Sequence, residues 1–175
     1  TSGPTSSPTE YFICEEAESA FAYKEGEISS SFLTDGLDRW GWTLGPLGPG
    51  EYTFSVISGA DSGDASSGEE VATLTFVYRE DGSAEATFTS LYGIAFEESQ
   101  IYVGSDDYPL DSQGDRTVTP GLFPYTHEEI SGKTSDMYTW GAGSFGGDIY
   151  IIAHVVTCGE VTPTASPTGS PTATP

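Results

Sequence analysis

The chain contains no asparagine, so it has no sequon for N-linked glycosylation, and any attached sugar must be on serine, threonine or modified proline. Basic residues are also scarce: five lysines and arginines stand against 27 aspartates and glutamates, which gives a formal net charge of -22. A chain this acidic cannot assemble the basic patch that nucleic-acid binding requires, so no nucleic-acid partner is expected. No apolar run approaches the length of a membrane span, so no membrane-spanning segment is expected.

The sequence begins at Thr1 without a hydrophobic leader, and we expect it to be a processed or internal segment. Its only two cysteines, Cys14 and Cys158, bracket the central part. We expect a disulfide that joins the first and last strands of one domain and places both tails at neighbouring exits; two separate buried thiols are the alternative. Closing so long a loop stabilises a fold by about 5 kcal/mol in the chain-entropy description. Such a disulfide favours an extracellular or cell-surface location.

Both ends of the chain are rich in proline, threonine and serine. From Thr162 a proline recurs at every fourth residue, and the head of the chain keeps the same period, so that a copy joined after Pro175 would continue it unbroken. This pattern predicts two linker segments, residues 1–10 and 160–175, around a domain at residues 11–159. It also predicts that the chain's partner is itself, in a tandem or head-to-tail array. The linkers should be extended polyproline-II rods.

The tails have the composition of an O-glycosylated stalk, and an undecorated, disordered linker is the alternative. The candidate O-glycosylation sites are Thr1, Thr5, Thr9, Thr162, Thr164, Ser166, Thr168, Ser170, Thr172 and Thr174. Hydroxylated prolines would add attachment points, and the candidates are Pro4, Pro8, Pro163, Pro167, Pro171 and Pro175.

The central residues combine many glycines with threonine, valine, isoleucine and aromatics, which is typical of β-strands joined by turns. Residues 20–23 predict a strand, although 15–24 could also form a helix, and residues 148–157 carry apolar groups on both faces, which indicates a central strand. About nine short strands predict an all-β fold, an antiparallel β-sandwich. The other expected strands are 30–33, 39–44, 52–56, 71–79, 83–89, 91–96, 100–103 and 137–140, with a turn at 45–50 and residues 117–119 leading into a second turn at Pro120-Gly121.

The clearest hairpin joins residues 71–79 to 83–89. A two-residue turn would place Phe76 opposite Thr87, with apolar and polar side chains mixed. A three-residue loop at 80–82 keeps the apolar side chains on one face, so we predict that register, with Gly82 in the left-handed conformation. The predicted pairs are Tyr78 with Ala84, Phe76 with Ala86 and Leu74 with Phe88.

A short apolar run, Tyr11, Phe12 and Ile13, precedes the first cysteine. It is expected to be either an edge strand of its own domain or a strand donated to the sheet of a neighbouring copy.

Several motifs together resemble a β-rich module of secreted microbial surface proteins, over residues 17 to 159. They are Trp40-Gly41-Trp42-Thr43, Gly50-Glu51-Tyr52-Thr53-Phe54, Ile101-Tyr102-Val103-Gly104, Thr117-Val118-Thr119-Pro120-Gly121 with Pro124-Tyr125, and Ile149-Tyr150-Ile151-Ile152-Ala153-His154 through Cys158. The resemblance implies an extracellular setting and no particular activity. The flanking tetrapeptide repeats are similar to glycosylated linkers of extracellular fibrils.

No set of catalytic residues stands out, so the chain is not expected to be an enzyme. The sequence His127-Glu128-Glu129 lacks the second histidine of a zinc-protease helix, and residues 142–146 miss the first glycine of a nucleophile elbow. His154 lies mid-strand among apolar residues and is expected to be a hydrogen-bonded core histidine. Trp40 and Trp42 would stack on sugars if exposed, but they share a face with Leu44, which favours the core.

Two acidic loops, at residues 61–70 and 106–115, offer oxygen ligands for a structural Ca²⁺ ion, the only cofactor considered. Neither has the spacing of a known calcium loop, and a solvated acidic loop is the alternative. The candidate ligands are Asp61, Asp64, Asp106, Asp107, Asp111 and Asp115.

The sequence therefore favours a non-catalytic structural unit of an extracellular, O-glycosylated filament or cell-surface fibre. The alternative hypothesis is an acidic adhesin-type module that binds glycans or Ca²⁺.

Overall fold

The computed structural model describes residues 11–14, 16–158 and 161–164, and these form twelve β-strands, two short 3₁₀ helices and no α-helix. None of the helices in these ranges is long and apolar enough to cross a membrane. The strands are β1 (Tyr11–Cys14), β2 (Ala17–Tyr23), β3 (Ser29–Ser31), β4 (Trp42–Leu47), β5 (Gly50–Ser58), β6 (Glu69–Tyr78), β7 (Ala84–Ser90), β8 (Ala95–Gly104), β9 (Tyr125–His127), β10 (Ser135–Trp140), β11 (Ile149–Cys158) and β12 (Val161–Thr164), and the 3₁₀ helices are η1 (Ala65–Ser67) and η2 (Pro120–Leu122).

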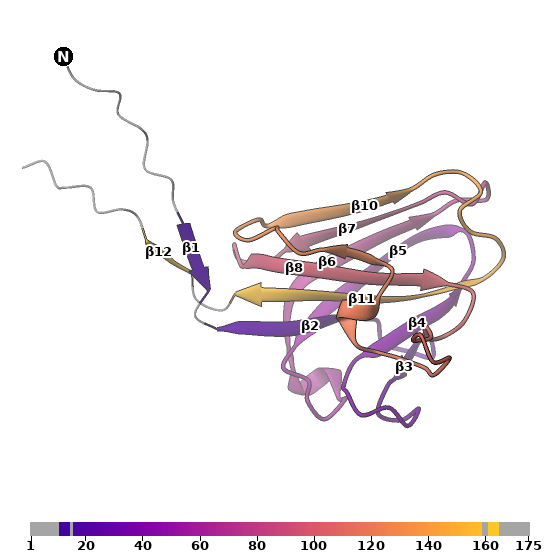
Figure 1. The fold of residues 1–175 in the computed structure, drawn as a ribbon, viewed down its shortest axis with the longest axis horizontal. Coiled ribbons are helices and arrows are strands. Elements are labelled where there is room, and N and C mark those ends of the chain that lie inside the picture. The colour runs from indigo at the N-terminus through magenta and orange to yellow at the C-terminus, as the bar shows by residue number, and fades with distance from the viewer. Residues whose placement is uncertain (1–10, 15, 159–160, 165–175) are drawn as a thin grey trace, which may run out of the picture.

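Strands β2 to β11 form one hydrogen-bonded antiparallel sheet that folds over into a sandwich, as the sequence predicts. In Figure 1, the layer of β2, β11 and β8 lies in front of the layer of β5, β6, β7 and β10. Strands β2 and β5 pair at the corner between the layers. The core lies between them, where Phe88 of β7 meets Phe96 of β8 with 6.4 Å between ring centroids.

Strand β11 is the centre of the front layer, which confirms the prediction of a central strand. One of its edges pairs with β8 along almost the whole strand, and the other pairs with β2 and then β4. Its residues are buried on both faces of the strand, and the loop segments 32–41 and 105–124 add the buried side chains Phe32, Tyr108 and Phe123 to the same core cluster. With both faces covered, β11 can carry apolar residues at consecutive positions.

The hairpin of β6 and β7 has the predicted register. Leu74 pairs with Phe88, Phe76 with Ala86 and Tyr78 with Ala84. Gly82 closes the three-residue loop with a φ of +86°. The side chains of the three apolar pairs all point into the core.

Two predicted elements are wrong. Residues 91–96 do not form a strand: Leu91 to Ile94 turn back, with Tyr92 at a φ of +57°, and β8 begins only at Ala95 and continues through the expected strand at 100–103. The turn predicted at 45–50 is shorter, because β4 continues through Gly45 and a cis Pro46 to Leu47. The buried Leu47 pairs with Ile149, so packing extends this strand despite its glycine and proline. The open choice at residues 15–24 is resolved as strand β2.

The two ends of the described chain leave the domain together. Strands β1 and β12 pair antiparallel in a separate two-stranded sheet, with Tyr11 opposite Thr164 and Cys14 opposite Val161. Figure 1 shows this pair projecting from one end of the sandwich. We call it the stem. Residues 161–164 are therefore a paired strand, whereas the sequence predicts an isolated polyproline-II rod there.

Candidate functional site

The root of the stem carries the predicted disulfide. Cys14, the last residue of β1, is bonded to Cys158, the last residue of β11, with 5.5 Å between their Cα atoms and a separation of 144 positions in sequence. The bond fastens the stem to the strand at the centre of the front layer. Both chain ends are thereby held at one place on the domain surface.

The residues predicted for tail chemistry lie mostly outside the described part of the chain. This holds for O-glycosylation candidates Thr1, Thr5, Thr9, Ser166, Thr168, Ser170, Thr172 and Thr174 and for hydroxyproline candidates Pro4, Pro8, Pro167, Pro171 and Pro175. Thr162, Pro163 and Thr164 lie on β12, and Tyr11, Phe12 and Ile13 lie on β1. The strand considered for donation thus pairs here with the chain's own C-terminal segment.

The first acidic loop uses one of its calcium candidates, Asp64, as a helix cap. Asp64 precedes η1, and its Oδ1 accepts hydrogen bonds from the Ser66 hydroxyl at 2.7 Å and the Ser66 N–H at 3.0 Å. These bonds stabilise the carboxylate and lower the pKa of Asp64. A local turn accounts for this carboxylate without a metal ion.

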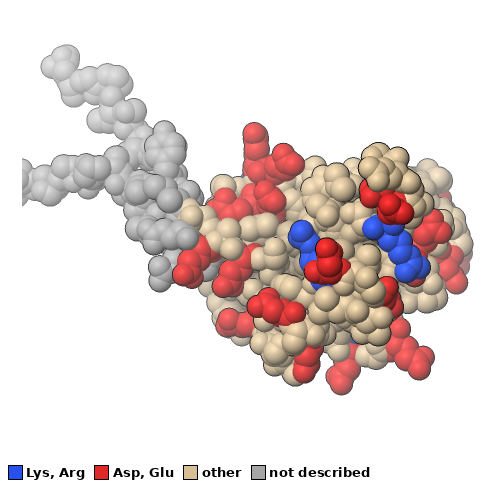
Figure 2. All heavy atoms as spheres, turned by 60° about the horizontal axis from the view of Figure 1, so that its bottom comes forward, with Lys and Arg blue, Asp and Glu red and all other residues tan. Residues whose placement is uncertain are grey.

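The second acidic loop is closed by its own contacts. Asp107 forms an ion pair with Arg116 at 3.2 Å, and Asp111 Oδ1 accepts hydrogen bonds from the backbone N–H groups of Gln113 and Asp115. The carboxylates of Asp107 and Asp111 thus serve one ion pair and one turn. Figure 2 shows that acidic side chains are spread over the visible face, with few basic ones among them.

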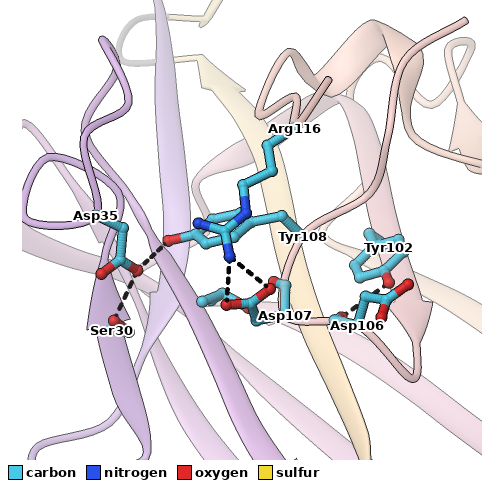
Figure 3. Close-up of polar contacts among 8 residues, drawn as sticks. Ser30, Asp35, Tyr102, Asp106, Asp107, Tyr108 and Arg116 are labelled. Atoms are coloured by element: carbon cyan, nitrogen blue, oxygen red, sulfur yellow. Dashed lines mark hydrogen bonds and ion pairs between the residues drawn. The ribbon is translucent and has the colours of Figure 1, made fainter. Parts of the chain in front are cut away.

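A buried tyrosine fastens this loop to the segment before β4. Tyr108 is 1% exposed and donates a hydrogen bond to Asp35 at 2.5 Å, while Ser30 donates to the same carboxylate at 2.8 Å (Figure 3). The guanidinium of Arg116 lies over the Tyr108 ring, 4.9 Å from its centroid. Burial, and next the hydrogen bond to Asp35, raise the pKa of Tyr108, which keeps its hydroxyl protonated as a donor. The cluster is a structural anchor.

The calcium candidates do not converge. Among the described residues, the only group of three potential ligand atoms within 4.8 Å of one another is formed by Cys14, Glu97 and Cys158. Two of these are joined in the disulfide and offer no thiolate, so this group does not fit a metal ion.

The residues that most resemble a catalytic site meet where β9 and β10 approach. Asp136 is largely buried, and both of its oxygens lie 2.9 Å from His127 Nδ1. The Ser99 hydroxyl donates to the same carboxylate, and the ring of His127 stacks on that of Tyr138 with 4.0 Å between centroids. A hollow of about 530 Å³ opens beside His127 and Asp136.

This group contains the residue types of a Ser-His-Asp triad in an arrangement that does not suit the chemistry. In a triad the serine binds the histidine nitrogen that is not held by the aspartate. Here Ser99 is fully buried and bonds to the aspartate itself. Burial raises the pKa of Tyr138 to about 12, and its hydroxyl lies 2.7 Å from that of Ser99. The cluster joins β8 and β9 of one layer to β10 of the other and thus closes the sandwich.

His154 is the core histidine that the sequence predicts. Its Nδ1 lies 2.5 Å from Gln100 Oε1, while the amide nitrogen of Gln100 donates to Glu98. Trp42 is likewise buried, and Trp40 packs against it at 5.8 Å as a partly buried ring. The tryptophans therefore belong to the core and its edge.

Sequence reasoning missed the contact between His127 and Asp136, although the two residues lie close together in sequence. The signal was weak, because neither β9 nor the buried position of Asp136 has a distinct pattern. It also missed the outward face of β5, β6, β7 and β10, described below, whose alternating threonines are visible in the sequence. Comparisons with protein-family models, curated proteins and solved structures found no match.

Proposed function

We propose that the chain is a non-catalytic structural unit of an extracellular, O-glycosylated fibre or cell-surface filament, in which copies follow one another through their Pro/Thr tails. The in-phase tails support this arrangement, because a second copy would continue the four-residue period. The sandwich supplies a compact bead. The tails supply spacing and a coat of sugars, since threonines on successive repeats of a polyproline-II rod point in different directions.

The disulfide at the root of the stem is the observation that carries the proposal. A covalent path runs along the first tail to Cys14, crosses to Cys158 and continues along the second tail. Residues 15–157 lie outside this path. In a fibre under tension, the force would pass through the disulfide and would leave the sandwich unloaded.

This arrangement suits a bead that hangs from a fibre. Adjacent antiparallel strands pulled at neighbouring ends separate one hydrogen bond at a time, so the stem alone would resist force weakly. The disulfide stops that separation after the stem. The bead would then keep its fold and its protease resistance however far the fibre is stretched.

Mass analysis of native material tests the proposal. The chain is isolated from its source, reduced, stripped of sugars by chemical deglycosylation and weighed. Multiples of 18.5 kDa, the mass of this sequence, together with a mass loss on sugar removal, are expected for a tandem glycosylated chain. A lone 18.5 kDa species that loses no mass on deglycosylation would contradict both the tandem arrangement and the sugar coat.

A further inference from the structure

The outward face of β5, β6, β7 and β10 carries two rows of four side chains, and seven of these eight side chains have a hydroxyl group. The strand registers place one side chain of each row on each strand. The first row is Thr53, Thr75, Thr87 and Met137, and the second is Ser55, Thr73, Thr89 and Ser135. Neighbours in a row are about 4.8 Å apart, and the rows are about 6.8 Å apart.

These hydroxyls are available to a ligand. Along each strand they alternate with fully buried residues such as Leu74 and Phe88, so they point away from the core. Within the described part of the chain, none of the seven hydroxyl side chains takes part in a hydrogen bond, whereas hydroxyls elsewhere, such as those of Thr43 and Ser99, do. Because threonine is branched at Cβ, these hydroxyls are held in few orientations.

The two rows contain no charged residue, in a chain with 27 acidic ones. Acidic groups flank the rows on both sides: Glu51 and Glu85, which forms an ion pair with Arg79, lie beyond the first row, and Glu70 of β6 pairs with Ile57 beyond the second. Apolar groups on the face are also few, with Met137 in the first row and Val77 in the next. A charged polymer or an apolar peptide therefore has little to bind here.

A hollow of about 540 Å³ continues the face at its β5 edge. Thr53 and Ser55, the first residues of the two rows, form part of its lining. Tyr23, Lys24, Glu25 and Asp64 line it as well, so an aromatic ring, an ammonium group and two carboxylates border the hydroxyl rows. A ligand with both apolar patches and many hydroxyls matches such a lining.

We propose that this face, together with the hollow, binds an extended neutral polysaccharide. Sugar hydroxyls donate and accept hydrogen bonds as serine and threonine hydroxyls do, and they carry no charge. A β-1,4-linked pyranose chain advances per sugar by a length close to the spacing of neighbouring strands. Laid across the strands along one row, it meets one hydroxyl side chain per sugar, and its end reaches the hollow. This binding site does not depend on the proposed role in a fibre.

Titration calorimetry with cellohexaose, and retention of the full chain on insoluble cellulose, test the site. Thr75→Lys places a long charged side chain at the middle of the first row and should lower the affinity by about tenfold, because it blocks the hydrogen bonds of that row. Thr126→Lys, at an exposed strand position on β9 in the other layer, should bind as the native chain does. Lys24→Met, in the hollow, should also weaken binding.

Far-UV circular dichroism and thermal melting establish that each variant is folded, which outward-facing substitutions should leave unchanged. The proposal is overturned if the native chain neither binds cellohexaose at millimolar concentration nor is retained on cellulose. It is equally overturned if folded Thr75→Lys binds as tightly as the native chain. Dimerisation through this face, seen by sedimentation and abolished by Thr75→Lys, would assign the face to a second copy and would also overturn it.

Discussion

At the scale of single residues, His154 shows how burial fixes a protonation state. The Gln100 amide nitrogen donates to Glu98, so Gln100 Oε1 must accept a hydrogen bond from His154 Nδ1–H, and the neutral ring carries no hydrogen on Nε2. Nε2 is buried and has no hydrogen-bond partner among the residues that the structure describes. Protonating it would bury a charge without compensation. Burial, with a smaller effect from nearby Arg39, therefore lowers the pKa of His154 from 6.5 to about 3.

This lowered pKa predicts a loss of stability in acid. Above the unfolded pKa of 6.5 the histidine is neutral in both states and the contribution to stability is complete. As the pH falls from 6.5 towards 3, the unfolded chain binds a proton that the folded chain refuses, so the free energy of unfolding drops by about 1.4 kcal/mol per pH unit from this residue. His154→Gln should remove this part of the slope.

Urea unfolding of both proteins between pH 4 and pH 7 measures the difference. The carboxylates titrate in both proteins, so subtracting one curve from the other isolates the histidine. Parallel curves would show that His154 accepts a proton in the folded protein as readily as in the unfolded chain.

At the scale of elements, the β6–β7 hairpin depends on one glycine. Gly82 has a φ of +86°, and the loop that follows β10 packs closely on it, with Phe145 N–H donating to the Gly82 carbonyl at 3.1 Å. A Cβ atom at Gly82 would press against the Phe145 carbonyl oxygen and lie 3.0 Å from Gly143 N. Gly114 has nearly the same φ, +87°, with open space around the position of a Cβ.

The two glycines form a matched pair for substitution. Gly114→Ala should cost about 1 kcal/mol, the strain of a left-handed alanine. Gly82→Ala should cost about 3 kcal/mol, because overpacking against backbone adds to that strain. Urea unfolding measures the free energy of unfolding of both variants. Equal losses of stability would mean that residues 143–145 move aside for the new Cβ atom at no energetic cost.

Sequence patterns predicted the elements whose structure depends on the alternation of apolar and polar residues within a short segment. The hairpin register followed from keeping Leu74 and Phe88 on one face, and the central strand followed from apolar residues on both faces of β11. The extent of β4 could not be predicted, because Gly45 and Pro46 are turn residues whose strand conformation depends on packing by Leu47. The cluster of His127 and Asp136 could not be predicted either.

The polar clusters around Asp136 and Asp35 are formed by residues that lie far apart in sequence. Ser99 lies 37 residues before Asp136 in sequence, and Tyr108 lies 73 residues after Asp35. No periodicity in either segment indicates such a pairing. The disulfide was predictable because two cysteines allow one intramolecular pairing, but the stem formed by β1 and β12 was not, because proline-rich segments seldom pair as strands.

At the scale of the whole molecule, the proposed role in a fibre depends on where the two chain ends leave the domain. The two layers of the sandwich are held together by the apolar core and by the polar cluster of Ser99, His127 and Asp136. The stem is a separate two-stranded sheet that is joined to the sandwich at the disulfide. With a net charge of -22, beads on one fibre would repel one another, which favours an extended array over collapse. Tension in such a fibre would bypass the sandwich.

Pulling on a tandem array of this chain by its two ends, in a single-molecule force experiment, tests this claim most directly. With the disulfide intact, the array should stretch without steps from unfolding beads. After reduction, or in a Cys14→Ser, Cys158→Ser variant, each bead should unfold in a step of about 500 Å, the extended length of the 144 residues that the disulfide spans. Steps of that length in the oxidised array would contradict the account.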